Sequence, residues 1–209
     1  NSLDAGARAI EIEVDEGGAA LCRVRDDGGG IPADELVLAL ARHATSKIGD
    51  IDDLESVRTL GFRGEALPSI ASVSRMISRP ATAEMAHVVS AVDGEVTGPA
   101  PHPHPPGTTV EVRDLFFNVP ARRKFLRSER TELTQIERLV ERLALSRFDV
   151  GFRLQAARRV LADFPPARDE RGRDARVAAV LGEEFIANAL KLDHEGAGLR
   201  LSGWFCLPT

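Results

Sequence analysis

Two carboxylates followed by three glycines, Asp26 to Gly30, form the segment of this sequence with the clearest chemistry. Asp26 ends an apolar run that alternates like a β-strand, with Cys22, Val24 and Asp26 on one face. An inward-facing carboxylate accepts hydrogen bonds and suits an exocyclic amine such as that of adenine. Neighbouring glycines let the backbone pass close to a flat ligand. Acidic hairpin turns share this pattern, so the segment alone leaves both interpretations open.

Three other short motifs accompany this segment in a fixed order. Asn1 and Asp4 lie near the end of an expected helix, GFRG (residues 61–64) runs into another helix, and GTT (residues 107–109) begins a strand. Each motif is weak evidence alone. Their order, together with the helix-strand-helix context, makes the set specific.

Composition limits the class of protein. The 209 residues fit one large or two small domains with enough apolar residues for a core. Cys22 and Cys206 lie far apart without metal-ligand spacing, which favours a reduced compartment. We find no apolar run long enough to cross a membrane and no start that resembles a signal peptide. These features predict a cytoplasmic protein without a membrane partner.

Positive charge is concentrated in one part of the chain. Residues 118–160 hold eleven Arg or Lys and five Asp or Glu, a local balance of +6 in a chain of net charge -5. Such a block suggests a face that binds a polyanion. The alternative is a solvated helix with i,i+4 ion pairs, which Glu137, Arg138, Glu141 and Arg142 would supply.

Periodicity places the elements that must position these residues. We expect strands at residues 10–14, 21–26, 75–78, 87–92, 108–114, 150–155 and 159–162. Helices are expected to end within residues 2–9, to start near Pro32, and to span about 52–57, 65–72, 133–143 and 175–181, with an apolar stripe on the helix at 133–143. Residues 98–107 hold five prolines and are predicted to form a loop in which His102 and His104 are solvent-exposed spacers rather than metal ligands.

Mixed helices and mostly hairpin-linked strands predict an α+β sandwich with helices on one face. The stretch from Pro165 through Asp174 is proline-rich and then charged, so it is the best candidate for a linker. A hairpin is expected around residues 196–198, and the tail after the linker is too short for a complete domain.

The ordered motifs resemble those of the GHKL ATPases, the class of gyrase B, heat-shock chaperones and histidine kinases. Longer strings are similar to those of the MutL family of DNA mismatch-repair proteins, over essentially the whole chain. They are NSLDAGA (1–7), ARHATSK (41–47), LGFRGEAL (60–67) and NVPARRKFL (118–126). The resemblance implies a layered GHKL (Bergerat) sandwich over residues 1–165, a linker at 166–174, and the start of a ribosomal-protein-S5-like domain at 175–209.

The resemblance also implies an ATP and Mg²⁺ site. Asp26 would accept the adenine amine with support from Thr108, and Asn1 would help to hold Mg²⁺, since a carboxamide oxygen suits a hard cation. The remaining nucleotide-binding residues fall into three groups with a shared role within each group. They are Gly28 and Gly30 along the nucleotide, Thr45, Ser46 and Lys47 in a lid, and Gly61, Arg63 and Gly64 at a helix N-terminus facing the phosphates.

Two departures from the family pattern carry consequences. Asp27 stands where the family usually has asparagine, and its carboxylate would repel a triphosphate unless it points outward, as strand parity predicts. The family's general base is a glutamate four residues before the position of Asn1, and its γ-phosphate lysine lies beyond Thr209. We therefore expect the intact parent to be an ATPase and these 209 residues alone to hydrolyse ATP poorly, because general-base assistance typically supplies about 10²–10⁴-fold.

For the parent, the resemblance implies a homodimeric clamp on DNA that closes on ATP binding and couples a MutS-type mismatch sensor to a downstream nuclease or helicase. Such a protein would be bacterial, cytoplasmic and nucleoid-associated. Phosphate contacts on DNA would come from the basic segment. Its candidates are Arg122, Arg123, Lys124, Arg127 and Arg130.

Three alternatives stay open at this point. A gyrase-type ATPase domain shares the nucleotide motifs but nothing else here. A histidine-kinase catalytic domain would not carry the PARRKF segment at residues 120–125. A non-catalytic, nucleotide-dependent binding module would bind ATP as the leading interpretation predicts, but would not hydrolyse it.

Overall fold

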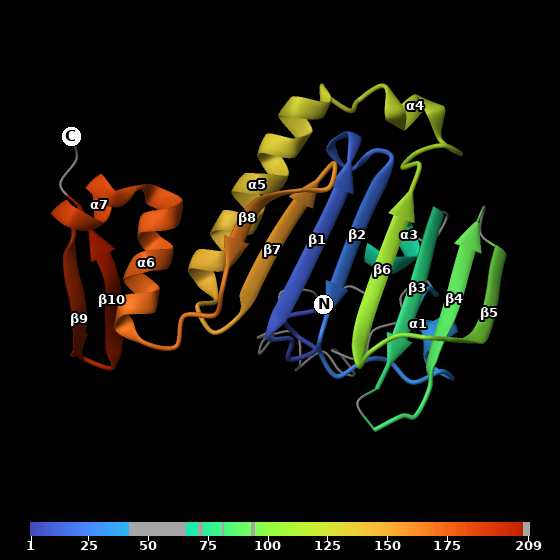
Figure 1. Cartoon of the computed structure of the whole chain (residues 1–209), viewed down its shortest axis with the longest axis horizontal. Coiled ribbons are helices and arrows are strands. Elements are labelled where there is room, and N and C mark those ends of the chain that lie inside the picture. Colours follow the sequence, from blue (N-terminus) through green and yellow to red (C-terminus); the bar gives the residue numbers. More distant parts are fainter. Residues whose placement is uncertain (42–65, 71–72, 81, 93–94, 207–209) are drawn as a thin grey trace.

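The computed structural model describes residues 1–41, 66–70, 73–80, 82–92 and 95–206. The expected helix near residues 52–57 and the turn at 93–94 lie outside these residues. Eight strands form one sheet in the order β5-β4-β3-β6-β2-β1-β7-β8 (Figure 1). All neighbouring strands are antiparallel except β1 and β7, which are parallel. The strands are β1 (Ala9–Asp15), β2 (Leu21–Asp26), β3 (Val73–Arg79), β4 (Ala86–Val92), β5 (Glu95–His102), β6 (Gly107–Arg113), β7 (Gly151–Ala156) and β8 (Arg159–Phe164).

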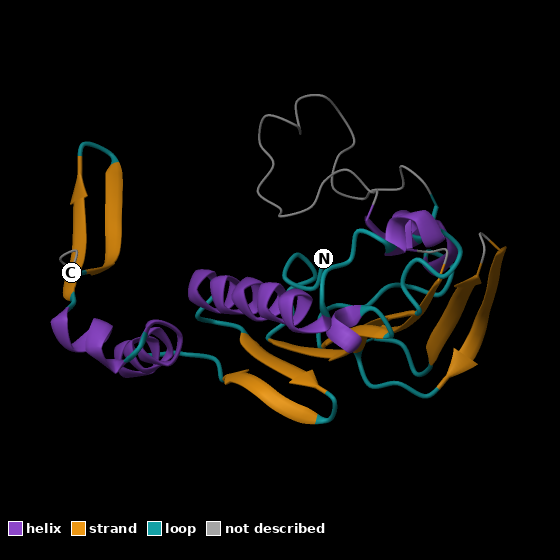
Figure 2. Cartoon of the chain, turned by 90° about the horizontal axis from the view of Figure 1, so that it is seen from above, coloured by secondary structure: helices purple, strands orange, loops and turns teal. Residues whose placement is uncertain are grey.

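Helices cover one face of this sheet, and Figure 2 shows them together on one side of the strands. They are α1 (Leu36–Ala39), α3 (Ala66–Ile70) and α5 (Glu129–Ser146), with the short α4 (Pro120–Arg123) before α5 and a 3-10 turn at Glu16–Gly18. This arrangement confirms the predicted α+β sandwich.

The apolar stripe of α5 packs on the parallel pair of strands, as periodicity predicts. Val140 and Ala144 are buried against Val14, Phe152 and Leu154 of β1 and β7. Leu139 does not belong to the stripe, since its side chain is 56% exposed. Alternation in β1 and β2 turns Ile10, Ile12, Val14, Cys22 and Val24 toward α5, whereas Glu11, Glu13, Arg23 and Arg25 lie on the opposite face.

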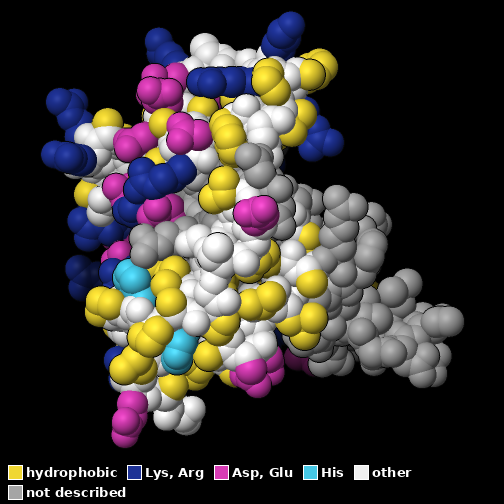
Figure 3. Space-filling model, turned by 90° about the vertical axis from the view of Figure 1, so that its right-hand side faces the viewer, with side chains coloured by type: hydrophobic (Ala, Val, Ile, Leu, Met, Phe, Trp, Pro, Cys, Tyr) yellow, Lys and Arg dark blue, Asp and Glu magenta, His cyan; other side chains and the backbone are white. Residues whose placement is uncertain are grey.

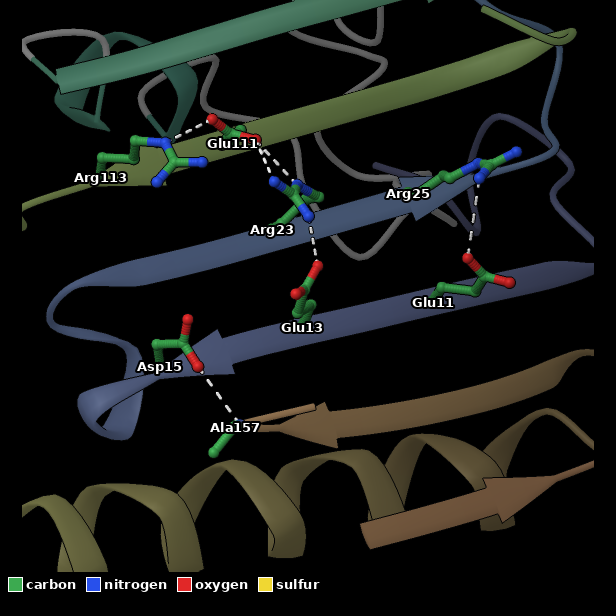
Figure 4. A network of polar contacts seen from close by, with 8 residues as sticks. All are labelled: Glu11, Glu13, Asp15, Arg23, Arg25, Glu111, Arg113 and Ala157. Atoms are coloured by element: carbon green, nitrogen blue, oxygen red, sulfur yellow. Dashed lines mark hydrogen bonds and ion pairs between the residues drawn. The ribbon is translucent and has the colours of Figure 1, made fainter. Parts of the chain in front are cut away.

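The opposite face carries a ladder of ion pairs across β1, β2 and β6 (Figure 4). Arg23 bonds Glu13 on β1 and lies 2.7 Å from Glu111 on β6, which in turn pairs with Arg113 at 2.7 Å. Burial alone would raise the pKa of Glu111, but hydrogen bonds from Arg113 and Arg23 more than offset this and hold the pKa below its ordinary value.

Residues 1–7 form a turn with the hydrogen bonds of a helix C-terminus. The N–H of Gly6 donates to the Leu3 carbonyl at 3.1 Å, and the N–H of Ala7 donates to the Ser2 carbonyl at 3.1 Å. This pair of bonds is the Schellman motif that closes helices. The sequence predicted a helix end over residues 2–9, and β1 already begins at Ala9. Gly6 closes the turn, with φ of 74°, rather than loosening a helix.

Residues 98–107 are a loop only in part: residues 103–106 connect two strands, as the prolines predicted, but residues 98–102 belong to β5. β5 runs to His102 and pairs with β4 through Pro101 and Ala100. Because β5 is the edge strand, its outer side needs no N–H donors, and prolines are tolerated there.

The C-terminal part consists of α6 (Glu170–Leu181), α7 (Glu183–Asn188) and the hairpin β9 (Leu190–Gly196) and β10 (Leu199–Phe205). The hairpin confirms the expected turn at residues 196–198. The predicted linker at 166–174 is in part helical, because Asp169 accepts the N–H of Gly172 at 2.7 Å and caps α6. Arg176 of α6 is buried and donates to the carbonyls of Ala144 and Arg147 at the end of α5. The division into domains stays a prediction.

None of the described helices has the length and apolar composition needed to cross a membrane.

Candidate functional site

Asp26 ends β2 on the helix-covered face of the sheet and is 7% exposed. Its neighbour in register on β6 is Thr108, and its neighbour on β1 is Ile10. The inward orientation predicted from strand parity is therefore what the structure has.

Three donors hold the Asp26 carboxylate. Oδ2 accepts the Ser2 hydroxyl at 2.6 Å, and Oδ1 accepts the backbone N–H groups of Gly28 at 3.0 Å and Thr108 at 3.3 Å. We call Ser2, Asp26, Gly28 and Thr108 the Asp26 cluster. It joins the N-terminal turn, β2, the glycine segment and β6 at one point, because the carboxylate on β2 is held by donors from the three other parts of the chain.

Ser78 supports this cluster from β3. Its side chain is 1% exposed and lies beside Thr108 in register. The Ser78 hydroxyl oxygen accepts the N–H of Ile31 at 2.7 Å and lies 3.0 Å from Thr108 Oγ1 and 3.2 Å from the Gly107 carbonyl. One buried hydroxyl thus connects the end of the glycine segment to the start of β6.

Two glycines are required by neighbouring backbone. Gly30 has φ of 74°, and a Cβ there would lie 2.5 Å from the Arg79 carbonyl oxygen at the end of β3. Gly107 has φ of 121°, and a Cβ there would lie 2.0 Å from the Asp26 carbonyl oxygen. Any side chain would displace the chain at both positions, so these glycines are fixed by the packing of β2, β3 and β6 whether or not a ligand is present.

Asp27 points away from the Asp26 cluster, as strand parity predicted. Its side chain is exposed, and Oδ1 accepts the N–H groups of Arg8 at 2.7 Å and Ala9 at 2.8 Å. The N–H of Gly29 also donates to the Ala5 carbonyl at 2.9 Å. The N-terminal turn is therefore attached to the glycine segment on both sides of Asp26.

Asn1 lies at the start of this turn, where its carbonyl accepts the N–H of Ala5 at 2.8 Å. The turn thus brings Asn1 to the same part of the fold as the Asp26 cluster. Six predicted site residues lie outside the described residues. They are Thr45, Ser46, Lys47, Gly61, Arg63 and Gly64.

Two residues of this site, Ser2 and Ser78, were not predicted from the sequence. Ser2 directly follows the predicted site residue Asn1. Its hydroxyl, next to a predicted ligand in the same turn, was the signal from which its role could have been inferred. Ser78 becomes visible only from the register that places it beside Thr108. Strand pairing between β3 and β6 spans about thirty residues of sequence, and no local pattern encodes it.

The two histidines of the proline-rich segment differ from the prediction. His104 is half-buried, and its Nε2 lies 2.8 Å from Thr109 Oγ1, so it is not a solvent-exposed spacer. Burial lowers the pKa of His104, and the Arg25 charge lowers it further. Within the described residues no three His, Cys, Asp or Glu side chains gather as metal ligands.

Of the five predicted phosphate-binding residues, Arg122 and Arg123 lie on α4, Lys124 and Arg127 lie on the connection from it to α5, and Arg130 lies in the first turn of α5. All five side chains are exposed. In the described part of the chain, no carboxylate pairs with any of them, and the i,i+4 pairs expected from Glu137, Arg138, Glu141 and Arg142 do not form. Figure 3 shows Lys and Arg side chains beside exposed hydrophobic ones at the upper end of the molecule, where α4 lies.

Comparisons with known proteins agree with this geometry. Residues 1–79 match the family of histidine kinase-, DNA gyrase B- and HSP90-like ATPases. The chain is 56% identical over 213 residues to the DNA mismatch repair protein MutL of Pseudomonas paraeruginosa, with all of this chain and 34% of that protein aligned. It is 55% identical over 210 residues to MutL of Xanthomonas oryzae pv. oryzae, covering 33% of that protein. The chain thus spans about a third of the length of these relatives.

Among solved structures, the Aquifex aeolicus MutL ATPase domain complexed with ADP is 31% identical, with a TM-score of 0.69 over 93% of this chain and 68% of that one. The fold, the order of the motifs and these alignments lead to one assignment. The chain belongs to the MutL family of DNA mismatch-repair proteins, and its large sheet has the fold of the GHKL ATPase domain of that family.

Proposed function

We propose that this protein binds ATP at the Asp26 cluster. The observation that carries the proposal is the buried Asp26 carboxylate, which has acceptor capacity left after three protein donors are counted. The 6-amino group of adenine supplies the missing donor. Thr108 supports the same edge, and Gly28 and Gly30 follow the nucleotide. That a MutL relative is known with ADP bound supports this proposal.

The phosphates and Mg²⁺ are assigned to residues around the cluster. Asn1 would hold Mg²⁺, because its carboxamide oxygen is of the ligand type that this cation prefers and the turn anchors it beside the glycine segment. Magnesium would neutralise phosphate charge there. The lid and the phosphate-binding helix start complete the site. Their residues are Thr45, Ser46 and Lys47 in the lid, and Gly61, Arg63 and Gly64 at the helix start.

ATP hydrolysis belongs to the intact protein in this proposal. The general-base glutamate is expected four residues before Asn1, and the γ-phosphate lysine in the domain after the linker. Nucleotide binding would order the lid and bring two N-terminal domains together as a homodimeric clamp, and hydrolysis would release them. The N-terminal turn, which carries Asn1, is hydrogen-bonded to the glycine segment. This supports the proposal, because the residues assigned to Mg²⁺ and to the nucleotide then belong to one hydrogen-bonded unit.

The clamp would act on DNA. Arg122, Arg123, Lys124, Arg127 and Arg130 would contact phosphates without reading sequence. Their exposure and lack of carboxylate partners in the described residues support this role over that of a self-neutralised helix. The protein would connect a MutS-type mismatch sensor with a downstream nuclease or helicase in the bacterial cytoplasm.

A nucleotide-binding and turnover experiment tests the central part of the proposal. Full-length protein is titrated with Mg²⁺ and ATP by calorimetry, and phosphate release is measured separately. We expect binding by the wild type and loss of at least about a hundredfold in affinity for Asp26→Ala, since an amine donor then faces no charged acceptor. Undiminished affinity in Asp26→Ala would refute the assignment. Binding without turnover would instead favour the non-catalytic nucleotide-dependent module.

A further inference from the structure

Ser2 makes the shortest hydrogen bond to Asp26, 2.6 Å from its hydroxyl oxygen to Oδ2. We propose that Ser2 is a specificity-determining residue that directs the remaining acceptor site of Asp26 at the 6-position of a purine, so that a 6-amino base is accepted and a 6-oxo base is rejected. The inference rests on the proposed nucleotide site and assigns a role to a residue outside the predicted set.

The Asp26 carboxylate has a limited number of acceptor sites. A carboxylate has two oxygens and about four lone-pair positions. The backbone N–H groups of Gly28 and Thr108 occupy Oδ1, and the Ser2 hydroxyl occupies one position on Oδ2. One position on Oδ2 remains. A single N–H donor from a ligand completes the set, whereas a ligand carbonyl oxygen at that point meets a negative charge with no proton between them.

Ser2 is itself held in place, which makes its hydroxyl a fixed donor. The Ser2 carbonyl accepts the N–H of Ala7 at 3.1 Å in the Schellman turn. Leu3, the next residue, packs against the core cluster under α5. The Gly29 to Ala5 hydrogen bond ties the same turn to the glycine segment. The hydroxyl therefore reaches Oδ2 from one defined direction, and the free lone pair points in another.

Removal of this hydroxyl changes the selectivity of the carboxylate as well as its stability. In Ser2→Ala both positions on Oδ2 are open, and one of the three hydrogen bonds that restrain rotation of the carboxylate is lost. Water then bonds Oδ2 in place of serine and can bridge to a 6-oxo group by donating to it. Because a bridging water can accept a hydrogen bond from a 6-amino group or donate one to a 6-oxo group, discrimination between the two kinds of base falls.

A purely structural role for Ser2 predicts a different result. If Ser2 only stabilised the N-terminal turn, its loss would weaken both kinds of base by the same factor and leave their ratio unchanged. The ratio of two affinities is therefore the measurement that separates the two roles.

The experiment uses the full-length protein with Mg²⁺ and compares ADP with IDP, which carries a 6-oxo group in place of the amine. Affinities are measured by calorimetry for the wild type, Ser2→Ala, Ser2→Cys and Ser2→Thr. We expect Ser2→Ala to lose about fivefold to tenfold in ADP affinity and to lose at least about fivefold in the ratio of ADP to IDP affinity. Ser2→Thr keeps a hydroxyl and should restore the ratio to within about twofold of the wild type.

An unchanged ratio in Ser2→Ala overturns the inference while leaving the nucleotide site intact. If Ser2→Ala does not fold, Ser2→Cys decides the matter, because its thiol is a weak donor of similar size and should lower the ratio as well. A Ser2→Cys ratio equal to that of the wild type is then the refuting result. Absence of ADP binding by the wild type would refute the proposed function instead, so the two failures are distinguishable.

Discussion

Asp27 Oδ1 accepts the backbone N–H of Arg8 at 2.7 Å and thereby ties the residue before β1 to the residue after β2. The same oxygen accepts the N–H of Ala9. An amide oxygen can accept the same two bonds, so the aspartate of this chain and the asparagine that the family resemblance leads us to expect are both compatible with the fold.

Substitution of Asp27 tests whether acceptor geometry or charge matters. We expect Asp27→Ala to lower the free energy of unfolding by about 1–2 kcal/mol, because two backbone donors lose a charged acceptor but remain accessible to water. Asp27→Asn should lose less than about 1 kcal/mol, since its amide oxygen still accepts both bonds. Urea denaturation of the full-length protein measures the difference. Equal losses in the two variants would show that the negative charge is what counts.

Ser78 provides a test of the buried hydroxyl behind the Asp26 cluster. Ser78→Ala removes a hydroxyl from a side chain that is 1% exposed and leaves the partly buried Ile31 N–H without its acceptor, so we expect a loss of about 1–3 kcal/mol in unfolding free energy. Ser146 is the control, because its hydroxyl also bonds the backbone, at the Leu143 carbonyl, but is exposed. Ser146→Ala should change stability by less than about 0.5 kcal/mol. A Ser78→Ala variant as stable as this control would contradict the assigned role.

How far the sequence predicts this structure depends on the range of the interactions involved. The inward direction of Asp26 follows from alternation within six residues of β2, and the packing of α5 follows from its 3.6-residue period. Both are local patterns. The position of Ser78 depends on the register of β3 against β6, which is set by pairing between distant segments and has no local signature.

Two local predictions differ in part from the structure for identifiable reasons. Prolines predicted a loop at residues 98–107, but residues 98–102 belong to β5, which lies at the sheet edge, where a missing N–H costs no ladder bond. The sequence predicted a helix from residue 175, but α6 begins at Glu170, because Asp169 caps it and buried Arg176 fixes that helix to the end of α5. In each case the position in the fold outweighed the local composition.

The ion-pair ladder on the sheet face opposite α5 makes the free energy of unfolding depend on pH. The pKa of Glu111 is lowered in the folded protein, so the stabilisation it gives is complete above its unfolded pKa and is lost as pH falls through the lower, folded value. We expect Glu111→Gln to be about 1–2 kcal/mol less stable than the wild type at pH 7. The difference should shrink steadily as the pH falls below about 4, near the ordinary pKa of glutamate.

Glu11 is the control for this pH dependence. It lies on the same face but pairs with Arg25 at 3.9 Å, and both side chains are largely exposed. Exposed pairs of this kind contribute about 0–1 kcal/mol, so Glu11→Gln should show little difference at any pH. Thermal unfolding between pH 3 and pH 8 measures both variants. A constant difference for Glu111→Gln across this range would mean that its carboxylate does not stabilise the fold through charge.

The basic segment gives a prediction that depends on salt. Replacing Arg122, Arg123 and Lys124 by alanine should weaken binding to duplex DNA of any sequence and reduce the slope of log affinity against log salt by about 2–3, since each phosphate contact contributes about 0.9. Arg168, Arg171 and Arg200 are exposed, and their triple alanine variant removes the same charge from the C-terminal part of the chain. If α4 contacts the phosphates, that control keeps the wild-type slope. An equal reduction in both variants would mean that net charge governs the binding, and an unchanged slope in the first would remove α4 from the DNA-binding surface.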